Sequence, residues 1–354
     1  MKGYRLNIGP ASFTEGDGIL RETSLSGFGG TALLVGEEFI LKKFRGELKR
    51  TLKSVRIANG GFAGECSENE IKRLCALGKN KKADFVTGIG GGKALDTAKA
   101  AAGRLKLPVV TIPTSAATCA AWTALSAVYT DEGSSRTYIL LDRCPDLLIL
   151  DTGIIASCPA RYLRSGMADA LAKFYEAMAF TGGSSPGRGI EAALGIARSI
   201  YDTVFESGMD AARDNEKTKL SAPLLKIMET NIMMAGLVGG LGGEGCRASV
   251  AHALCNGFTQ AVETRPCLHG EIVGFCSIVQ LVLEKKFEEA GKLARFYKKL
   301  QLPYRLAHIG AKPSLLGRVI GYAFSPHETM RNFPVKVTKN MVEKAILELE
   351  GMKI

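Results

Sequence analysis

The first 158 residues alternate short apolar runs with segments in which apolar residues recur every three or four positions. A helix is predicted to begin at the capping box Ser67–Glu70. Because strands and helices alternate, we expect a parallel sheet with helices on both faces. The apolar runs predict buried strands at Thr31–Val35, Asp84–Thr87, Leu107–Ile112 and Leu147–Leu150.

From residue 159 onward the pattern is helical and contains no second series of strands. The change falls near Asp151–Pro159, so we expect two domains: an α/β domain over residues 1–158 and an all-α domain over residues 159–354. Helices are expected over residues 160–180, 187–206, 216–240, 245–263, 270–285, 287–300 and 340–350.

Composition narrows the class of protein. Apolar residues make up 46% of the chain, enough for sizeable cores, and no apolar run reaches the length of about 18 residues that spans a membrane. The N-terminal MKGYRLNIGPASF lacks the apolar stretch of a signal peptide. The 9 cysteines are scattered without a paired framework. These features predict a cytoplasmic protein with reduced thiols and no membrane partner.

The net charge of +11 raises the question of nucleic-acid binding. The basic residues are spread along the chain, and their tightest clusters, Lys42–Arg50 and Lys79–Lys82, are short and lack interleaved aromatic residues. We therefore expect a solvated basic surface and no nucleic-acid partner. Such a surface also favours anionic cofactors and substrates.

A glycine run, GIGGGKALDTAKA over residues 88–100, follows a predicted strand and opens a predicted helix. Glycines there let a phosphate approach the backbone, and the helix start offers free N–H groups. The run matches neither the G-x-G-x-x-G motif nor a P-loop, and a structural turn is the alternative. Lys93 and Asp96 lie on the first turns of the helix. The small-residue stretch after Pro113 predicts either a narrow pocket or a packed loop.

Two histidines flank a break between predicted helices. His252 begins a helical pattern, Pro266 ends it, and His269 stands just before the next apolar run. Imidazole is the commonest metal ligand, so the two rings could share one ion if the connection folds back. Alternatively, one ring caps a helix and the other is hydrogen-bonded in a core.

Asp169 is a candidate third ligand, within the segment SGMADALAKFYEA. A carboxylate among apolar neighbours is costly unless it is paired or bound to a cation. The alternative is an exposed acid in the first turn of a helix, where the helix dipole favours it.

Together these segments resemble the iron-containing, or group III, alcohol dehydrogenase superfamily, and most of all its glycerol dehydrogenase-like branch. The resemblance covers nearly the whole chain. It is carried by GIGGGKALDTAKA (88–100), PTSAATCAAWTALSAVYTDEG (113–133), PDLLILDTGII (145–155), GMADALAKFYEA (166–177), AHALCNGF (251–258) and LHGEIVGF (268–275).

The resemblance implies a Rossmann-like NAD(P)-binding domain over residues 1–158 and a helical, metal-binding catalytic domain over residues 159–354. It implies that Asp169, His252 and His269 hold one divalent ion, zinc by preference or ferrous iron. It also implies a cofactor site at the glycine run and the loop that follows, and a homo-oligomer. The cofactor residues are then Gly90, Gly91, Gly92, Lys93, Asp96, Thr114, Thr118, Leu125 and Tyr129.

The resemblance also bears on the substrate. Glycerol dehydrogenases carry an aspartate where this chain has Cys119, and commonly a second histidine where it has Cys255. Loss of a carboxylate removes a repulsion against an anionic substrate. We therefore expect an NAD(P)-linked oxidoreductase that interconverts a 2-hydroxy acid and a 2-oxo acid, with Cys119 at the substrate.

The alternatives are a glycerol (polyol) dehydrogenase, a dehydroquinate synthase-like lyase, and a metal-free nucleotide-binding protein without catalysis. The cofactor is NAD or NADP. Gly36 leaves room for the extra phosphate of NADP, but Glu37 and Glu38 would repel it, which favours NAD slightly.

Overall fold

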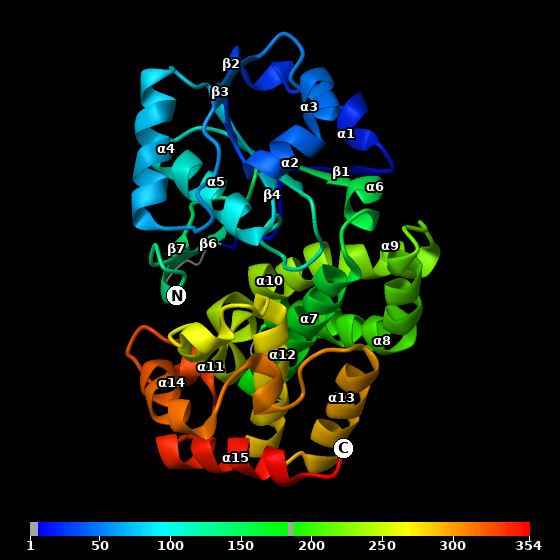
Figure 1. The fold of residues 1–354 in the computed structure, drawn as a ribbon, viewed down its shortest axis with the longest axis vertical. Coiled ribbons are helices and arrows are strands. Elements are labelled where there is room, and N and C mark those ends of the chain that lie inside the picture. Colours follow the sequence, from blue (N-terminus) through cyan, green and yellow to red (C-terminus); the bar gives the residue numbers. More distant parts are fainter. Residues whose placement is uncertain (1–5, 183–186) are drawn as a thin grey trace. The chain divides into compact units, whose positions relative to one another are not determined.

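The computed structural model describes residues 6–182 and 187–354. It separates the chain into two units, each with its own core (Figure 1). The first comprises Met1–Pro159 and the short segment Thr218–Leu220, and the second comprises Ala160–Lys217 and Ser221–Ile354.

The first unit is built on a six-stranded, fully parallel sheet, as the alternation of strands and helices predicts. All four predicted strands are present, close to their expected bounds, but the two edge strands and an antiparallel hairpin were not predicted. In sheet order the strands are β1 (Ser12–Gly16), β8 (Leu147–Asp151), β5 (Val109–Pro113), β4 (Phe85–Gly90), β2 (Thr31–Val35) and β3 (Arg56–Asn59), and the hairpin is β6 (Leu125–Tyr129) with β7 (Ser135–Leu140).

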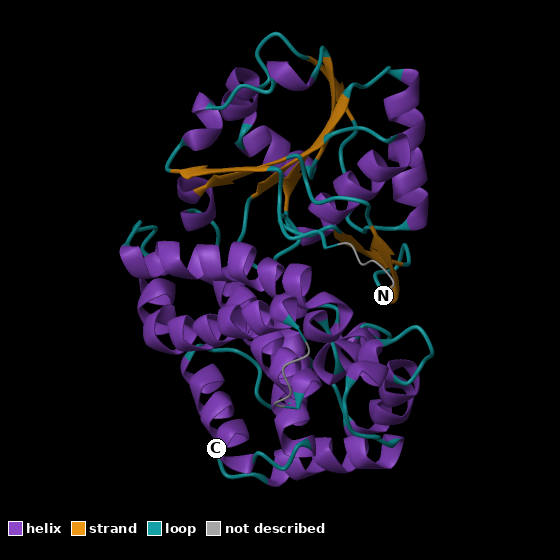
Figure 2. Cartoon of the chain, turned by 180° about the vertical axis from the view of Figure 1, so that it is seen from behind, coloured by secondary structure: helices purple, strands orange, loops and turns teal. Residues whose placement is uncertain are grey.

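Helices cover both faces of this sheet, which is why its central strands are continuous apolar runs (Figure 2). Alternate residues of β2 enter two different cores: Leu34 packs with α1, α2 and α3, whereas Leu33 packs with α4 and α5. Ser67 caps α4 by accepting a hydrogen bond from the Glu70 N–H, which is one half of the predicted capping box. The Ser67 N–H donates to Glu65 O, and the Glu70 carboxylate accepts from the Ala63 N–H. The helices are α1 (Ile19–Glu22), α2 (Glu38–Lys43), α3 (Arg45–Thr51), α4 (Glu68–Asn80), α5 (Gly92–Leu105) and α6 (Thr152–Ala156).

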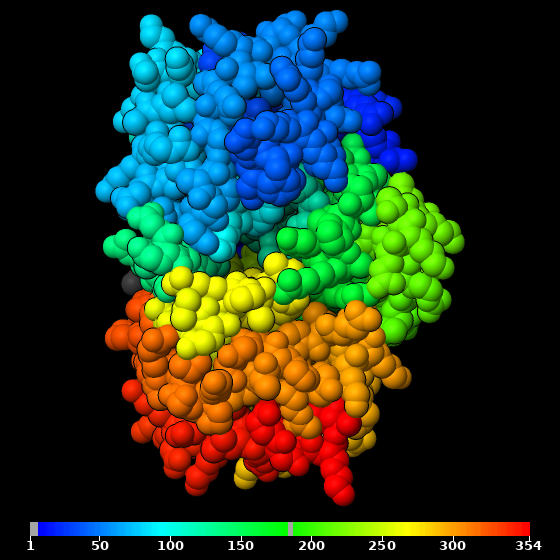
Figure 3. Space-filling view, viewed as in Figure 1, coloured from blue at the N-terminus to red at the C-terminus, as the bar shows by residue number. Residues whose placement is uncertain are grey.

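In its described part, the second unit contains helices and no strands, with α7 packed against α8, α10 and α12. The helix α14 was not predicted. Figure 3 shows the C-terminal α14 and α15 on the surface of this unit, in orange and red. The helices are α7 (Ala160–Thr181), α8 (Arg188–Glu216), α9 (Ala222–Glu229), α10 (Ala235–Arg247), α11 (Val250–Phe258), α12 (His269–Leu283), α13 (Phe287–Lys299), α14 (Leu316–Ala323) and α15 (Lys339–Gly351).

One stretch of the second unit, Ala222–Arg247, is long and apolar enough to cross a membrane by length and composition alone. It comprises α9, α10 and the π-helical turn Thr230–Met234 between them. Of its most apolar window, 56% is buried inside the unit. That burial is typical of the core helix of a globular unit.

Candidate active site

Helix α7 carries the central residue of the candidate site. Asp169 lies well inside this helix and is only 3% exposed. The structure therefore rejects the alternative of an exposed acid in a first turn. Lys173 and Glu176 follow at four and seven residues, so all three side chains lie on one face of the helix. The other residues over 166–177 are apolar, aromatic or small, which makes this polar stripe distinctive.

The structure brings Asp169, His252 and His269 together from three helices. Asp169 Oδ1 lies 3.4 Å from His252 Nε2 on α11 and 3.6 Å from His269 Nε2 at the first position of α12. One potential ligand atom from each residue lies within 4.8 Å of the other two. Asp169 Oδ1 is buried and accepts no well-formed hydrogen bond. Such an arrangement suits a cation.

His269 reaches this point because α12 begins in backbone contact with α7. A Cβ atom added to Gly270 would lie 1.9 Å from the carbonyl oxygen of Ser165, so only glycine fits there. An ion pair reinforces the contact: Arg161 donates to both oxygens of Glu271, at 2.6 and 2.7 Å. Glu271 also accepts from the Leu268 N–H and thereby caps α12. The position of His269 is thus fixed at the helix start.

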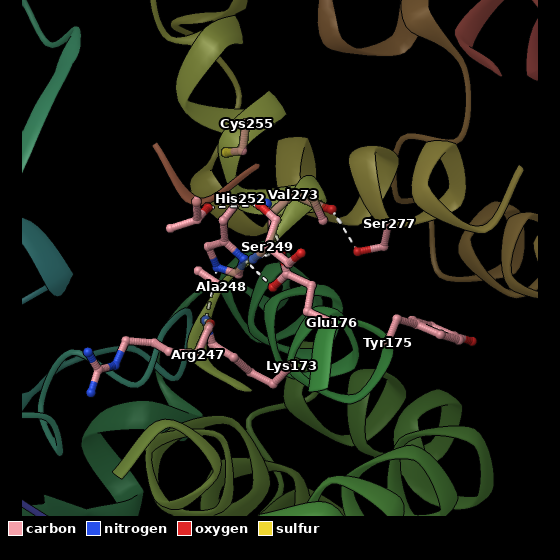
Figure 4. Close-up of polar contacts among 12 residues, drawn as sticks. Lys173, Tyr175, Glu176, Arg247, Ala248, Ser249, His252, Cys255, Val273 and Ser277 are labelled. Atoms are coloured by element: carbon pink, nitrogen blue, oxygen red, sulfur yellow. Dashed lines mark hydrogen bonds and ion pairs between the residues drawn. The ribbon is translucent and has the colours of Figure 1, made fainter. Parts of the chain in front are cut away.

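Glu176 fixes the other histidine. Its fully buried carboxylate accepts hydrogen bonds from the N–H groups of Ser249 and His252, at 2.7 and 3.0 Å, and so caps α11. The same carboxylate lies 2.6 Å from His252 Nδ1. Figure 4 shows the His252 ring between Glu176 and Lys173. Because Nδ1 donates to a carboxylate, the ring directs Nε2 toward Asp169, as in a carboxylate–histidine–metal arrangement.

Two further side chains complete the surroundings of the rings. Lys173 Nζ lies 2.9 Å from His252 Nε2 and donates to the carbonyl of Arg247 at 2.9 Å. Cys255 Sγ lies 3.5 Å from His269 Nδ1. Cys255 was expected as a departure from the family pattern, whereas no role was predicted for Lys173 and Glu176. The spacing of Asp169, Lys173 and Glu176, among apolar, aromatic and small residues over 166–177, was the signal that could have revealed them.

The charges in this cluster shift one another's ionisation. Burial alone would raise the pKa of Asp169, but the charge of Lys173 and the two imidazole rings beside it hold this pKa well below its usual range. Burial alone would likewise raise the pKa of Glu176, and the His252 ring lowers it. Burial would lower the pKa of His269, but Cys255 and Asp169 raise it to about 9. Asp169 is therefore ionised at neutral pH and available to a cation.

The glycine run lies in the sheet unit, between the end of β4 and the start of α5. Gly90 has φ +146°, a conformation that favours glycine, and a Cβ there would lie 2.6 Å from Glu37 Oε2. Gly91 is the N-cap of α5, and no atom lies within 4 Å of an added Cβ. A Cβ on Gly92 would lie 2.9 Å from Thr118 Oγ1. The helix start thus has open space beside free backbone N–H groups.

Besides Thr118, three further predicted cofactor residues border this loop. The Thr114 N–H donates to Gly90 O at 3.0 Å. Lys93 Nζ lies 4.9 Å from the centre of the Tyr129 ring and pairs with Glu65 at 2.6 Å. Lys93 is half-exposed, so it could exchange Glu65 for an anionic ligand.

Asp96 and Leu125 take part in hydrogen bonds between α5 and β6. Asp96 pairs with the buried Lys99 at 2.9 Å and accepts from the Ala127 N–H at 3.0 Å. Lys99 also donates to Leu125 O. These bonds fasten β6 to α5, so Asp96 supports the hairpin. Cys119, the expected substrate residue, is half-buried in the loop after β5, where its carbonyl accepts from the Trp122 N–H at 3.0 Å.

Comparison with known proteins gives consistent results. Residues 10–152 match the family model described as iron-containing alcohol dehydrogenase. The glycerol dehydrogenase of Thermotoga maritima is 39% identical over 95% of this chain and 94% of its own length. Hydroxycarboxylate dehydrogenase A of Escherichia coli is 34% identical over 82% of each chain. The crystal structure of a probable glycerol dehydrogenase from Sinorhizobium meliloti superposes with a TM-score of 0.90, at 30% identity over 98% of both chains.

Fold and relatives define the class as metal-dependent alcohol dehydrogenases of the group III type. The chain belongs to the iron-containing alcohol dehydrogenase family. It is a glycerol dehydrogenase-like oxidoreductase that acts on CH–OH groups of small molecules. The expected preference for 2-hydroxy acids is less well supported than its alternative, because four relatives named glycerol dehydrogenase are 37–39% identical and the hydroxycarboxylate enzyme is 34% identical.

Proposed function

We propose that this chain is an NAD-linked, metal-dependent dehydrogenase that interconverts glycerol, or a similar small polyol, and the corresponding ketone. The observation that carries the proposal is the convergence of Asp169, His252 and His269 in a chain whose similar relatives include several glycerol dehydrogenases. We further propose that it works in the cytoplasm as a homo-oligomer. The nine cysteines all lie in the described part of the chain and form no disulfide there, which suits a reducing compartment.

The three residues fit a divalent ion by their chemistry. Asp169 contributes a buried oxygen without a well-formed hydrogen bond, and His252 and His269 contribute Nε2 atoms directed toward it. One carboxylate and two imidazoles suit zinc or ferrous iron, with zinc our first choice, and leave coordination positions for substrate. A bound ion would act as a Lewis acid on the carbonyl or alcohol oxygen of the substrate. The protein's part is to hold the three ligands in position through Glu176, Arg161 and Glu271.

The glycine run is proposed to bind the pyrophosphate of the cofactor, supported by the open space at Gly91 and the free N–H groups of α5. Glu37 supports NAD over NADP. This residue follows β2, next to β4 in the sheet, and its buried Oε2 faces Gly90 without a hydrogen-bond partner. A carboxylate there accepts hydrogen bonds from ribose hydroxyls and repels a 2′-phosphate. Burial raises the pKa of Glu37, and ribose hydroxyls would supply the partners that it lacks.

A second candidate substrate class is the 2-hydroxy acids. It is favoured by Cys119, which places a neutral thiol where glycerol dehydrogenases carry a carboxylate. The 34% identity with hydroxycarboxylate dehydrogenase A supports the same class.

A substrate panel distinguishes the two classes. Purified protein, loaded with zinc or ferrous iron, is assayed by NADH absorbance with glycerol, other diols, and 2-hydroxy and 2-oxo acids, and each assay is repeated with NADP. We expect the highest kcat/KM with glycerol and NAD, loss of activity on chelation, and recovery on addition of metal. A preference for 2-oxo acids would transfer the proposal to the second class, and full activity after complete removal of metal would refute the metal site.

A further inference from the structure

We infer that Lys173 competes with the metal ion for His252, and so sets how tightly the site binds metal. The inference deepens the metal site proposed above and rests on it. No feature of the sequence assigned a role to this lysine. Its position one helical turn after Asp169 places it among the proposed ligands.

The geometry of the lysine is that of a buried group with two partners. Lys173 is 6% exposed, and its Nζ lies 2.9 Å from both His252 Nε2 and the carbonyl oxygen of Arg247 (Figure 4). A nitrogen–nitrogen distance of 2.9 Å requires that one atom donates and the other accepts. Nζ and Nε2 therefore share one hydrogen bond.

That bond uses the atom that a metal would need. Nδ1 of His252 faces Glu176 at 2.6 Å, which leaves Nε2 as the nitrogen directed toward Asp169. An imidazole nitrogen has either one lone pair or one proton. Whichever nitrogen holds the shared proton, Nε2 cannot coordinate an ion while it is bonded to Lys173.

Like the hydrogen bond, the positive charge of Lys173 opposes metal binding. Asp169 and Glu176 are buried carboxylates, and Lys173 is the lysine that contributes positive charge beside them. Buried carboxylates are costly without such compensation. The lysine thus stabilises the metal-free ligand set, and an incoming ion must both displace Nζ from Nε2 and lie near its charge.

Replacing Lys173 with methionine tests this competition. Methionine is of similar length and has no N–H group. The metal-free state then loses its hydrogen bond and its charge compensation, and the metal-bound state loses a repulsion. All three effects favour the bound state. Because the loss of one hydrogen bond to a charged group alone corresponds to about a tenfold change in an equilibrium constant, we expect zinc affinity to rise about tenfold or more. A purely structural role would weaken both states equally and leave the affinity unchanged.

The chain offers a matched control in Lys99→Met. Lys99 is also buried, at 1% exposed, donates to the backbone carbonyl of Thr123 at 3.0 Å and pairs with Asp96 at 2.9 Å. It belongs to the sheet unit and touches none of the proposed ligands. This variant should lose stability without any change in zinc affinity.

The experiment titrates zinc into metal-free full-length protein against a chromophoric chelator, for wild type, Lys173→Met, Lys99→Met and His252→Ala. We expect tighter binding only in Lys173→Met and loss of binding in His252→Ala. If Lys173→Met does not fold, Lys173→Gln replaces it, because its side chain is one atom shorter and no longer spans both acceptors.

The outcomes separate the inference from the site on which it rests. Unchanged or weaker binding in Lys173→Met, with binding abolished in His252→Ala, overturns the competition and leaves the metal site standing. An equal gain in Lys99→Met overturns it as well, since the gain would then reflect general loosening. Wild-type binding by His252→Ala refutes the metal site itself, and the inference with it.

Discussion

Replacing Glu176 with glutamine is the change that most directly tests how the site is held. The carboxylate accepts from Ser249 N, His252 N and His252 Nδ1, at 2.7, 3.0 and 2.6 Å. A glutamine keeps one oxygen for the two backbone donors but places an NH2 group opposite Nδ1. Two donors cannot face each other, so the ring must move its proton to Nε2. That nitrogen is then no longer a metal ligand.

The substitution is expected to change both the stability of the protein and its affinity for metal. Exchange of a hydrogen bond to a buried carboxylate for one to a neutral amide lowers the free energy of unfolding of the metal-free protein by about 1–1.5 kcal/mol, the difference between the two kinds of bond. Loss of the partner that orients a ligating histidine typically weakens metal binding by about 10–100-fold. Both are measurable on one preparation, by urea denaturation and by zinc titration against a chelator.

Glu70→Gln provides the control. Glu70 is also buried, at 5% exposed, accepts from the Ala63 N–H at 3.0 Å and pairs with Arg73 at 2.7 Å, but lies in the sheet unit. It should lose stability and keep wild-type zinc affinity. If Glu176→Gln also keeps wild-type affinity while unfolding more easily, Glu176 only stabilises the fold and the reasoning about the ring is wrong.

Three other substitutions, one of them with a matched control, test separate parts of the molecule. Gly91→Val should abolish NADH binding by fluorescence titration with little loss of stability, because no atom lies within 4 Å of its Cβ, and unchanged affinity would contradict a phosphate site there. Gly270→Ala should lower the free energy of unfolding by about 1–3 kcal/mol, since its Cβ would overlap Ser165 O. Gly317→Ala, whose Cβ meets open space, should not, and equal losses in urea denaturation would refute the close contact. Cys119→Asp should raise the kcat/KM ratio of glycerol to 2-oxobutyrate, because a carboxylate accepts from hydroxyls and repels an anion by about 1–4 kcal/mol at 4 Å, and a ratio that stays constant would mean that Cys119 merely packs.

The sheet shows which elements a sequence reveals. The strand β2 was predicted at its observed bounds because both of its faces are buried, which requires an unbroken apolar run. The edge strand β3, with the sequence RIAN, exposes three of its four residues and carries no such run. The strand β1 is likewise exposed or half-exposed throughout. In addition, β1 pairs with β8, which lies far away along the chain.

The site shows a similar division. Asp169, His252 and His269 were predicted from family motifs, and the structure brings them together, although spacing alone left their meeting open. Lys173 and Glu176 were missed because each needs a specific partner on another helix before its role is visible. The contact of Gly270 with Ser165 is of the same kind, since only the facing backbone shows why a side chain is excluded.

The polar stripe on α7 also constrains which changes in chain length this enzyme can accept. Asp169, Lys173 and Glu176 are held on one helix, so helical register alone fixes their relative directions. One inserted or deleted residue between them would turn the two parts of the stripe by about 100° and shift them by about 1.5 Å along the axis. Length variation among proteins that share this site should therefore be absent between the aspartate and the glutamate. An aspartate, a lysine four residues later and a glutamate seven residues later then form a spacing by which such proteins can be found in sequences of unknown structure.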